Sequence, residues 1–122
     1  NQGLNALTVA IWLSLLGKQG IQELANICLQ RAHYCADKIR QIQGFSLYTC
    51  QPFFHEFVVQ YEVSVSELLT FMKTRNCLPG LALECWYPQL NHHFLVTVTE
   101  MNTPQEIDTF ISLLRQFVQQ QT

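Results

Sequence analysis

The segment 94–99, Phe-Leu-Val-Thr-Val-Thr, constrains the fold more than any other part of the chain. Four of its six residues are β-branched and it contains no Gly or Pro, which is typical of a β-strand. In an extended conformation Phe94, Val96 and Val98 lie on one face, and Leu95 lies on the other. We therefore expect a central strand that is covered on at least one face.

Helix and strand patterns alternate along the rest of the chain. Apolar residues at spacings of three and four predict helices over 21–42, from Val65 to about Asn76, and from Pro104 onwards. Strands are predicted over 45–50 and 54–61, with an apolar segment over 81–87, and the short Gln-Pro connection at 51–52 favours an antiparallel pair. Ser64 and Thr103 each stand three residues before a Glu, the spacing of a capping box. Gly44 is expected to end the helix before it.

This order predicts an α+β fold, with a mostly antiparallel four-stranded sheet and helices packed on one face. Two N-terminal helices, separated by Gly-Lys-Gln-Gly at 17–20, precede the sheet. We interpret residues 1–122 as a single C-terminal domain fragment, in which 1–43 form a helical segment and 44–122 form a ββαββα sheet unit. A chain of 122 residues is long enough to bury one core without a metal ion or disulfides.

The first sixteen residues contain no charged side chain, and residues 4–16 read Leu-Asn-Ala-Leu-Thr-Val-Ala-Ile-Trp-Leu-Ser-Leu-Leu. A membrane span needs about 20 apolar residues, so this run is too short. A helix that is apolar on all sides is normally buried on all sides, and a chain of this size cannot cover it. We therefore predict that the chain self-associates and that this helix forms an interface, through Leu4, Leu7, Ile11, Trp12 and Leu15.

Composition supports a covered surface and excludes some functions. Charged residues make up 13% of the chain, whereas a typical soluble domain has about a quarter, so another domain or chain should cover part of the surface. The net charge of −2, without a Lys/Arg cluster, argues against nucleic-acid binding. Five cysteines without a CxxC pair indicate reduced thiols in a cytoplasmic protein, and we expect neither a signal peptide nor a membrane partner.

No motif in the chain predicts chemistry. His55-Glu56 resembles half of a zinc-protease motif, but Val59 stands where the second His is needed. The pair at 92–93 is expected to be two solvated turn histidines. None of the three lysines has a neighbour that would lower its pKa for a Schiff base; they are Lys18, Lys38 and Lys73. We therefore predict no catalytic, cofactor-binding or metal-binding residue in this chain.

Six stretches carry a resemblance to a known family. They are Asn-Gln-Gly-Leu at 1–4, Gly-Lys-Gln-Gly at 17–20, Leu-Gln-Arg-Ala-His-Tyr at 29–34, Pro-Phe-Phe-His-Glu-Phe-Val-Val at 52–59, Tyr-Pro-Gln-Leu at 87–90, and Val-Thr-Glu at 98–100 followed by Glu-Ile-Asp at 106–108. In this order they resemble glycine dehydrogenase (decarboxylating), the P-protein of the glycine cleavage system, and in particular subunit 1 of its two-subunit bacterial form. The resemblance covers essentially the whole chain.

The resemblance implies a pyridoxal-phosphate enzyme of the aspartate-aminotransferase fold, of which this chain would be the C-terminal small domain. The family decarboxylates glycine oxidatively and passes the aminomethyl group to the lipoyl arm of the H-protein. The implied partners are the large domain of the same subunit, subunit 2 and the H-protein. Pyridoxal phosphate is expected on subunit 2, and the implied role of this chain is structural.

Two alternatives from other classes stay open. The chain could be a stand-alone α+β module with a ligand-binding or regulatory function. It could also be the small domain of another pyridoxal-phosphate enzyme, such as a cysteine desulfurase-like protein. The apolar first helix argues against the stand-alone module, because such a protein would leave a large hydrophobic surface exposed.

Overall fold

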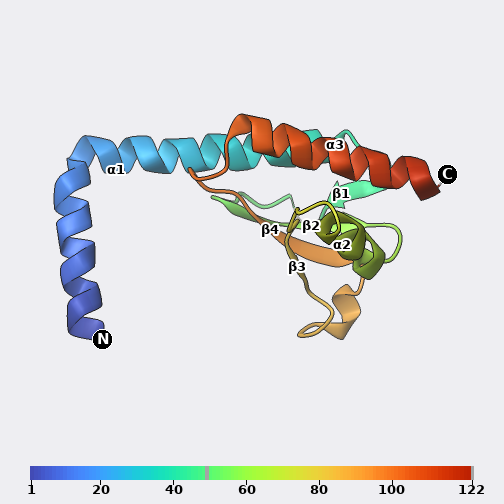
Figure 1. The fold of residues 1–122 in the computed structure, drawn as a ribbon, viewed down its shortest axis with the longest axis horizontal. Coiled ribbons are helices and arrows are strands. Elements are labelled where there is room, and N and C mark those ends of the chain that lie inside the picture. Colours follow the sequence, from blue (N-terminus) through green and yellow to red (C-terminus); the bar gives the residue numbers. More distant parts are fainter. Residues whose placement is uncertain (49, 122) are drawn as a thin grey trace.

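The computed structural model describes residues 1–48 and 50–121 and confirms an α+β fold. The elements in chain order are α1 (Gln2–Arg40), β1 (Phe45–Leu47), β2 (Glu56–Tyr61), α2 (Val65–Lys73), β3 (Leu81–Ala82), the 3-10 helix η1 (Pro88–Leu90), β4 (His93–Thr97) and α3 (Pro104–Gln121). Figure 1 shows α3 and the second half of α1 lying together on one side of the sheet.

The four strands form one antiparallel sheet in the order β1-β2-β4-β3. β4 lies between β2 and β3, so the prediction of a central strand in this part of the chain is confirmed. Its register with β2 places Phe57 opposite Val96 and Val59 opposite Phe94. These four side chains are buried on the face that the helices cover.

The core forms where this sheet face meets one stripe from each helix. Ile39 of α1, Leu68 of α2 and Leu114 of α3 are fully buried in the same cluster as Val59 and Phe94. The spacing of the buried positions on α3, at 107, 111, 114 and 117, follows the helical period that the sequence predicts. Helices on one face of an antiparallel sheet leave its other face without a second layer.

α1 consists of two helices that meet at a kink, so the prediction of two N-terminal helices with a break at 17–20 is confirmed. Gly17 has φ 64° and ψ −178°, and it is the one residue of α1 with a non-helical backbone. A positive φ at this position favours glycine, which lacks the Cβ that makes the conformation costly for other residues. Residues 2–16, which we call the arm, therefore turn sharply away from the rest of α1 (Figure 1).

Two predicted boundaries at the end of α1 and around β1 are wrong. α1 ends at Arg40, so Gly44, with φ 82°, belongs to the turn that enters β1 and does not end the helix. β1 ends at Leu47 and β2 begins at Glu56, so their connection is longer than the tight Gln-Pro turn that the sequence predicts. The two strands nevertheless pair in the antiparallel sense, as predicted.

The apolar segment 81–87 forms a much shorter strand than its composition predicts. Leu81 and Ala82 pair with β4, and the Leu83 N–H adds one hydrogen bond to the His93 carbonyl at 3.1 Å. The chain then turns back on itself, because the N–H groups of Trp86 and Tyr87 both donate to the carbonyl of Leu83. Both aromatic side chains are exposed on the loop that leads into η1.

Only one of the two predicted capping boxes forms. At α3 the Thr103 backbone N–H donates to the Glu106 carboxylate at 2.7 Å, and the Glu106 N–H donates to Thr103 Oγ1 at 3.2 Å. At α2 the Ser64 side chain makes no capping hydrogen bond, since its Oγ pairs with Ser66 Oγ at 2.8 Å. The prediction for Ser64 is therefore wrong.

Candidate functional site

The arm carries seven exposed large apolar side chains. The five residues predicted to form an interface are all exposed, from 47% for Trp12 to 82% for Leu15. Val9 and Leu13, on other sides of the helix, are exposed as well. The helix is therefore bare around its circumference. That exposure is what an interface requires before its partner binds, and the interface itself stays a prediction.

Two of the four polar side chains within the arm form hydrogen bonds to the backbone of their own helix. Thr8 Oγ1 donates to the Leu4 carbonyl at 3.0 Å, and Ser14 Oγ donates to the Ala10 carbonyl at 2.7 Å. Both hydroxyl donors are thereby satisfied inside the helix. The arm consequently offers a partner an almost wholly apolar surface.

One helix in the described part of the chain, α1, is long and apolar enough to cross a membrane by length and composition alone. The kink at Gly17 limits the straight part of this apolar stretch to residues 2–16. At a rise of 1.5 Å per residue, such a helix is about 22 Å long, whereas a bilayer core is about 30 Å thick. The geometry of the arm therefore suits a protein partner better than a membrane span.

Polar contacts fix the second half of α1 to the segment between β4 and α3. Arg31 Nη1 donates to the carbonyls of Glu100 and Asn102, and Cys28 Sγ donates to the Glu100 carboxylate at 3.2 Å. Burial, followed by this hydrogen bond, raises the pKa of the Cys28 thiol. Nothing local in the sequence marks Arg31 for this role, because its partners lie 69 and 71 residues along the chain.

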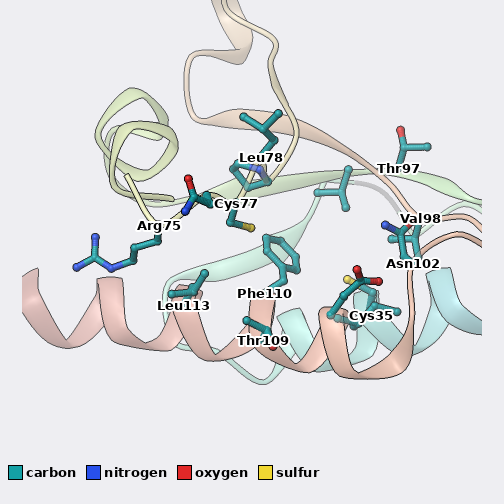
Figure 2. A pocket seen from close by; sticks show the side chains of 15 residues that line it. Cys35, Arg75, Cys77, Leu78, Thr97, Val98, Asn102, Thr109, Phe110 and Leu113 are labelled. Carbon is teal, nitrogen blue, oxygen red and sulfur yellow. The ribbon is translucent and has the colours of Figure 1, made fainter. Parts of the chain in front are cut away.

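A cleft of about 370 Å³ opens between α3, β4 and the segment that follows α2. Figure 2 shows the Phe110 ring of α3 facing Cys77 across it, while Arg75 points away from them. The Arg75 guanidinium lies 3.6 Å from the centre of the Phe71 ring and donates to the Phe71 carbonyl. This cation is therefore already engaged and is poorly placed to hold an anion in the cleft.

The titratable groups that line the cleft do not form a catalytic set. Burial raises the pKa of Cys35 to about 12, and it also raises the pKa of Cys77, so both thiols stay protonated at neutral pH. The Glu106 carboxylate accepts hydrogen bonds from Thr103, which lower its pKa and engage it in the cap of α3. The cleft thus combines an apolar lining with groups that have structural roles.

The histidines do not gather into a site. His33 stacks on Phe53 with ring centres 4.3 Å apart, and His92 Nδ1 lies 3.0 Å from the Val63 carbonyl. Within residues 1–48 and 50–121 no three His, Cys, Asp or Glu side chains lie close enough together to hold a metal ion. The half motif at His55 therefore gains no further ligand from the fold.

His93 differs from its predicted environment. It is buried, with 7% of its surface exposed, and not a solvated turn residue. β4 begins at this residue, which places the ring on the sheet face away from the helices. There it packs against the Tyr48 ring, with the two ring centres 4.6 Å apart and the ring planes at 84°. Burial and the neighbouring His92 lower the pKa of His93, and the Leu90 backbone opposes this in part. The ring is therefore neutral at pH 7.

Comparison with known proteins identifies the family. A family model described as the glycine cleavage system P-protein matches residues 1–114. The chain belongs to this family. The match includes the arm, the kink, the whole sheet and most of α3. Membership favours the P-protein over the two alternatives that the sequence left open.

Two relatives carry the name probable glycine dehydrogenase (decarboxylating) subunit 1. The protein from Chlorobaculum parvum is 43% identical over 114 residues, and that from Desulfitobacterium hafniense is 42% identical over 112 residues. These matches cover 93% and 92% of this chain, but 25% of each relative. The chain thus spans about a quarter of the length of the relatives that it matches.

Solved structures share the fold of this P-protein family member at lower identity. An inhibitor-bound glycine decarboxylase (P-protein) matches 93% of this chain and 25% of its own, with a TM-score of 0.80 at 22% identity. A phosphoserine aminotransferase from Cytophaga hutchinsonii has a TM-score of 0.66 at 10% identity, over 89% and 29% of the two chains. A NifS-like protein from Rickettsia africae has a TM-score of 0.68 at 9% identity, over 81% and 30%. These likenesses confirm the predicted aminotransferase-type fold.

Proposed function

We propose that this chain is the C-terminal domain of a glycine dehydrogenase (decarboxylating) subunit, subunit 1 of the two-subunit form, and that its role there is structural. The observation that carries the proposal is the bare apolar arm on a chain of the P-protein family. Relatives about four times as long contain the additional material that such a surface needs. The large domain of the same subunit is the partner that covers the arm.

In the whole enzyme the reaction is the oxidative decarboxylation of glycine, with transfer of the aminomethyl group to the lipoyl arm of the H-protein. This chain supplies no reacting group to it. Its contribution is to present a rigid apolar helix at a fixed angle, set by Gly17, to the domain that carries the rest of the subunit. Subunit 2 and the H-protein are partners of the assembled enzyme, which we place in the cytoplasm, where the five free cysteines would stay reduced.

The residues of this chain do not fit pyridoxal phosphate, the cofactor that the family implies. The cofactor needs a lysine amine in a desolvated pocket and donors for its phosphate. Lys18 and Lys73 are exposed on helices, and the Lys38 ammonium lies 5.3 Å from the centre of the Tyr34 ring. None of the three lines the cleft. Following the family resemblance, we assign the cofactor to subunit 2.

A binding experiment tests the proposal. The 122-residue chain is titrated with the separately produced part of the Chlorobaculum parvum relative that precedes the matched region, and complex formation is followed by analytical ultracentrifugation. We expect the wild-type chain to bind and a Leu7→Asp, Ile11→Asp variant to lose binding, because two carboxylates would be desolvated in an apolar contact. Gln22→Asp, Asn26→Asp makes the same charge change at the same spacing on the exposed side of α1 and should bind normally.

The proposal is overturned if the wild-type chain does not bind, or if the arm variant binds as well as its control. An absorbance band of a lysine-bound pyridoxal phosphate on the isolated chain, abolished by changing one of its three lysines, would overturn the structural role in favour of a catalytic one.

A further inference from the structure

The face of the sheet away from the helices carries an apolar row that runs across all four strands. Tyr48, directly after β1, Val58 of β2, Leu95 of β4 and Leu81 of β3 form this row. Leu95 is the register partner of both Val58 and Leu81, and the Tyr48 N–H donates to the Val58 carbonyl at 3.0 Å. Paired residues of neighbouring strands point to the same face, so the four side chains stand side by side.

The row is only partly protected from solvent by its own neighbours. Tyr48 is 52% exposed and Leu81 is 49% exposed, while Val58 and Leu95 are half-buried. Helices α1, α2 and α3 contribute their buried residues to the core on the opposite face. Within residues 1–48 and 50–121, the open face of the sheet therefore has no second layer of the kind that an apolar face normally packs against.

Polar residues border the row on both sides. On the same face, two residues along from Val58 and Leu95, Thr97 Oγ1 donates to the Glu56 carboxylate at 3.1 Å. On the other side Gln60 stands opposite His93. An apolar centre with a polar rim is the usual arrangement of a specific protein contact, and it differs from the scattered apolar residues of an ordinary surface.

His93 indicates that this face is incomplete as it stands. Both of its ring nitrogens are buried, and within residues 1–48 and 50–121 neither has a hydrogen-bond partner of normal geometry, although the Leu90 backbone lies near enough to raise the pKa of the ring. A buried polar group without a partner is normally rare in a native protein, and it destabilises the fold. The His93 ring packs against the ring of Tyr48, with the ring centres 4.6 Å apart, and Tyr48 is itself half-exposed. A domain that packs on Tyr48 would therefore also lie close to His93.

The arm and the sheet lie on the same side of the second half of α1. In Figure 1 the arm turns to the side of α1 on which the sheet lies. A body seated in the angle between them would touch the arm with one side and the open sheet face with another. The curated relatives, of which this chain spans about a quarter, are large enough to supply one such body.

We infer that the apolar row is a second docking surface for the same large domain that covers the arm, so that this domain is held against two faces at an angle. The inference rests on the proposed function. Two separate contacts, one on the arm and one on the sheet, fix an orientation, whereas a single helix would leave the domains free to rotate. A second copy of this chain is the competing occupant, and the experiment below separates the two.

Oxidative footprinting of aromatic side chains tests the inference in a full-length chimera. The chimera joins the part of the Chlorobaculum parvum relative that precedes the matched region to Asn1 of this chain. The oxidation rates of three side chains are measured by mass spectrometry, both in the chimera and in the free chain, which is diluted until it is monomeric. Trp12 reports on the arm, Tyr48 on the apolar row, and Tyr34, on the helical layer, is the reference of the same residue type as Tyr48.

We expect Trp12 and Tyr48 to be oxidised several-fold more slowly in the chimera than in the free chain, with Tyr34 unchanged. Protection of Trp12 without Tyr48 overturns this inference and leaves the proposed function standing. Loss of protection at Trp12 overturns the proposed function itself. The free chain at high concentration tests the competing occupant. If it has the mass of a dimer and its Tyr48 is protected as strongly as in the chimera, the row binds a second copy and the inference is overturned.

A pair of variants locates the contact within the sheet. Leu81→Lys places a charge in the row at an exposed position that the core does not need, and it should restore rapid oxidation of Tyr48 in the chimera. Leu78→Lys makes the same change three residues earlier, at a side chain that is 84% exposed and outside the row, and it should leave Tyr48 protected. Equal effects of the two variants would contradict the assignment to the row.

Discussion

Arg31 of α1 holds the carbonyl of Asn102 at 2.8 Å, and this contact fastens the helical layer to the turn from which α3 begins. The same guanidinium nitrogen also donates to the Glu100 carbonyl. Asn102 in turn accepts the Thr99 N–H on its side chain at 2.9 Å. The end of β4, the start of α3 and the middle of α1 are therefore joined by one short network, next to the cleft.

Replacing Arg31 should be costly, because two carbonyls of this network would lose a charged donor. We expect Arg31→Ala to lower the free energy of unfolding by about 1.5–3 kcal/mol, the usual range for hydrogen bonds to a charged group. The urea midpoint of the purified chain measures the effect. Arg115→Ala removes an exposed arginine of α3 and should change the midpoint little. Equal losses in the two variants would show that the network does not stabilise the fold.

The two capping positions should respond differently to the same kind of substitution. Thr103→Ala removes an N-cap side chain that forms a complete capping box, and it should cost about 0.5–2 kcal/mol. Ser64→Ala removes a hydroxyl that bonds only to Ser66, so we expect a much smaller loss. Thermal unfolding of both variants checks this order, and a larger loss at Ser64 would contradict the structure of the two helix ends.

Glu106 makes a defined contribution to the pH dependence of stability. Hydrogen bonds from the Thr103 backbone and side chain lower its pKa below the ordinary value of 4.5. A lowered pKa in the folded state adds stability above pH 4.5, and this stability disappears as the pH falls through the folded pKa. We therefore expect Glu106→Gln to be less stable than wild type at neutral pH, and the gap to close in acid. Glu23→Gln, at an exposed position on α1, is the control, and a gap that stays constant with pH would refute the expectation.

The thiols should fall into fast and slow classes toward an aromatic disulfide reagent. Cys50 and Cys85 are exposed and should react within the first phase in native protein. Cys35, with 1% of its surface exposed and a pKa of about 12, should react only after denaturation. Mass spectrometry assigns each modified residue. Modification of Cys35 in the native chain at the rate of Cys50 would mean that the core around α1 opens readily.

The main elements of the fold can be predicted because their signals are local. The β-branched run at 94–99 specifies β4, and the helical spacing of apolar residues specifies α3, whatever the rest of the chain does. Local signals fail where backbone geometry or distant residues decide. Ser64 and Thr103 have the same motif, yet only Thr103 meets the geometry of a cap. Tyr48 buries His93, although the histidine alone resembles a turn residue.

The two candidate surfaces, the arm and the apolar row, also differ in how far the sequence predicts them. The arm can be recognised in the sequence because it is uncharged and apolar around its whole circumference. The apolar row cannot, since its members come from four strands and become neighbours only through the sheet register. The direction of the bend at Gly17 cannot be predicted from the sequence either. It depends on the backbone conformation of this one residue, which glycine permits but does not require.

The most direct test of the account is the mass of the chain in solution. Apolar surface contributes roughly 25 cal/mol per Å² on burial, so an uncovered arm should drive self-association when the large domain is absent. Static light scattering at high micromolar concentration should give a mass clearly above the 14.1 kDa of one chain, and Leu7→Asp, Ile11→Asp should return it to 14.1 kDa. A wild-type chain that stays at 14.1 kDa would contradict the central claim that the arm is a surface made to be covered.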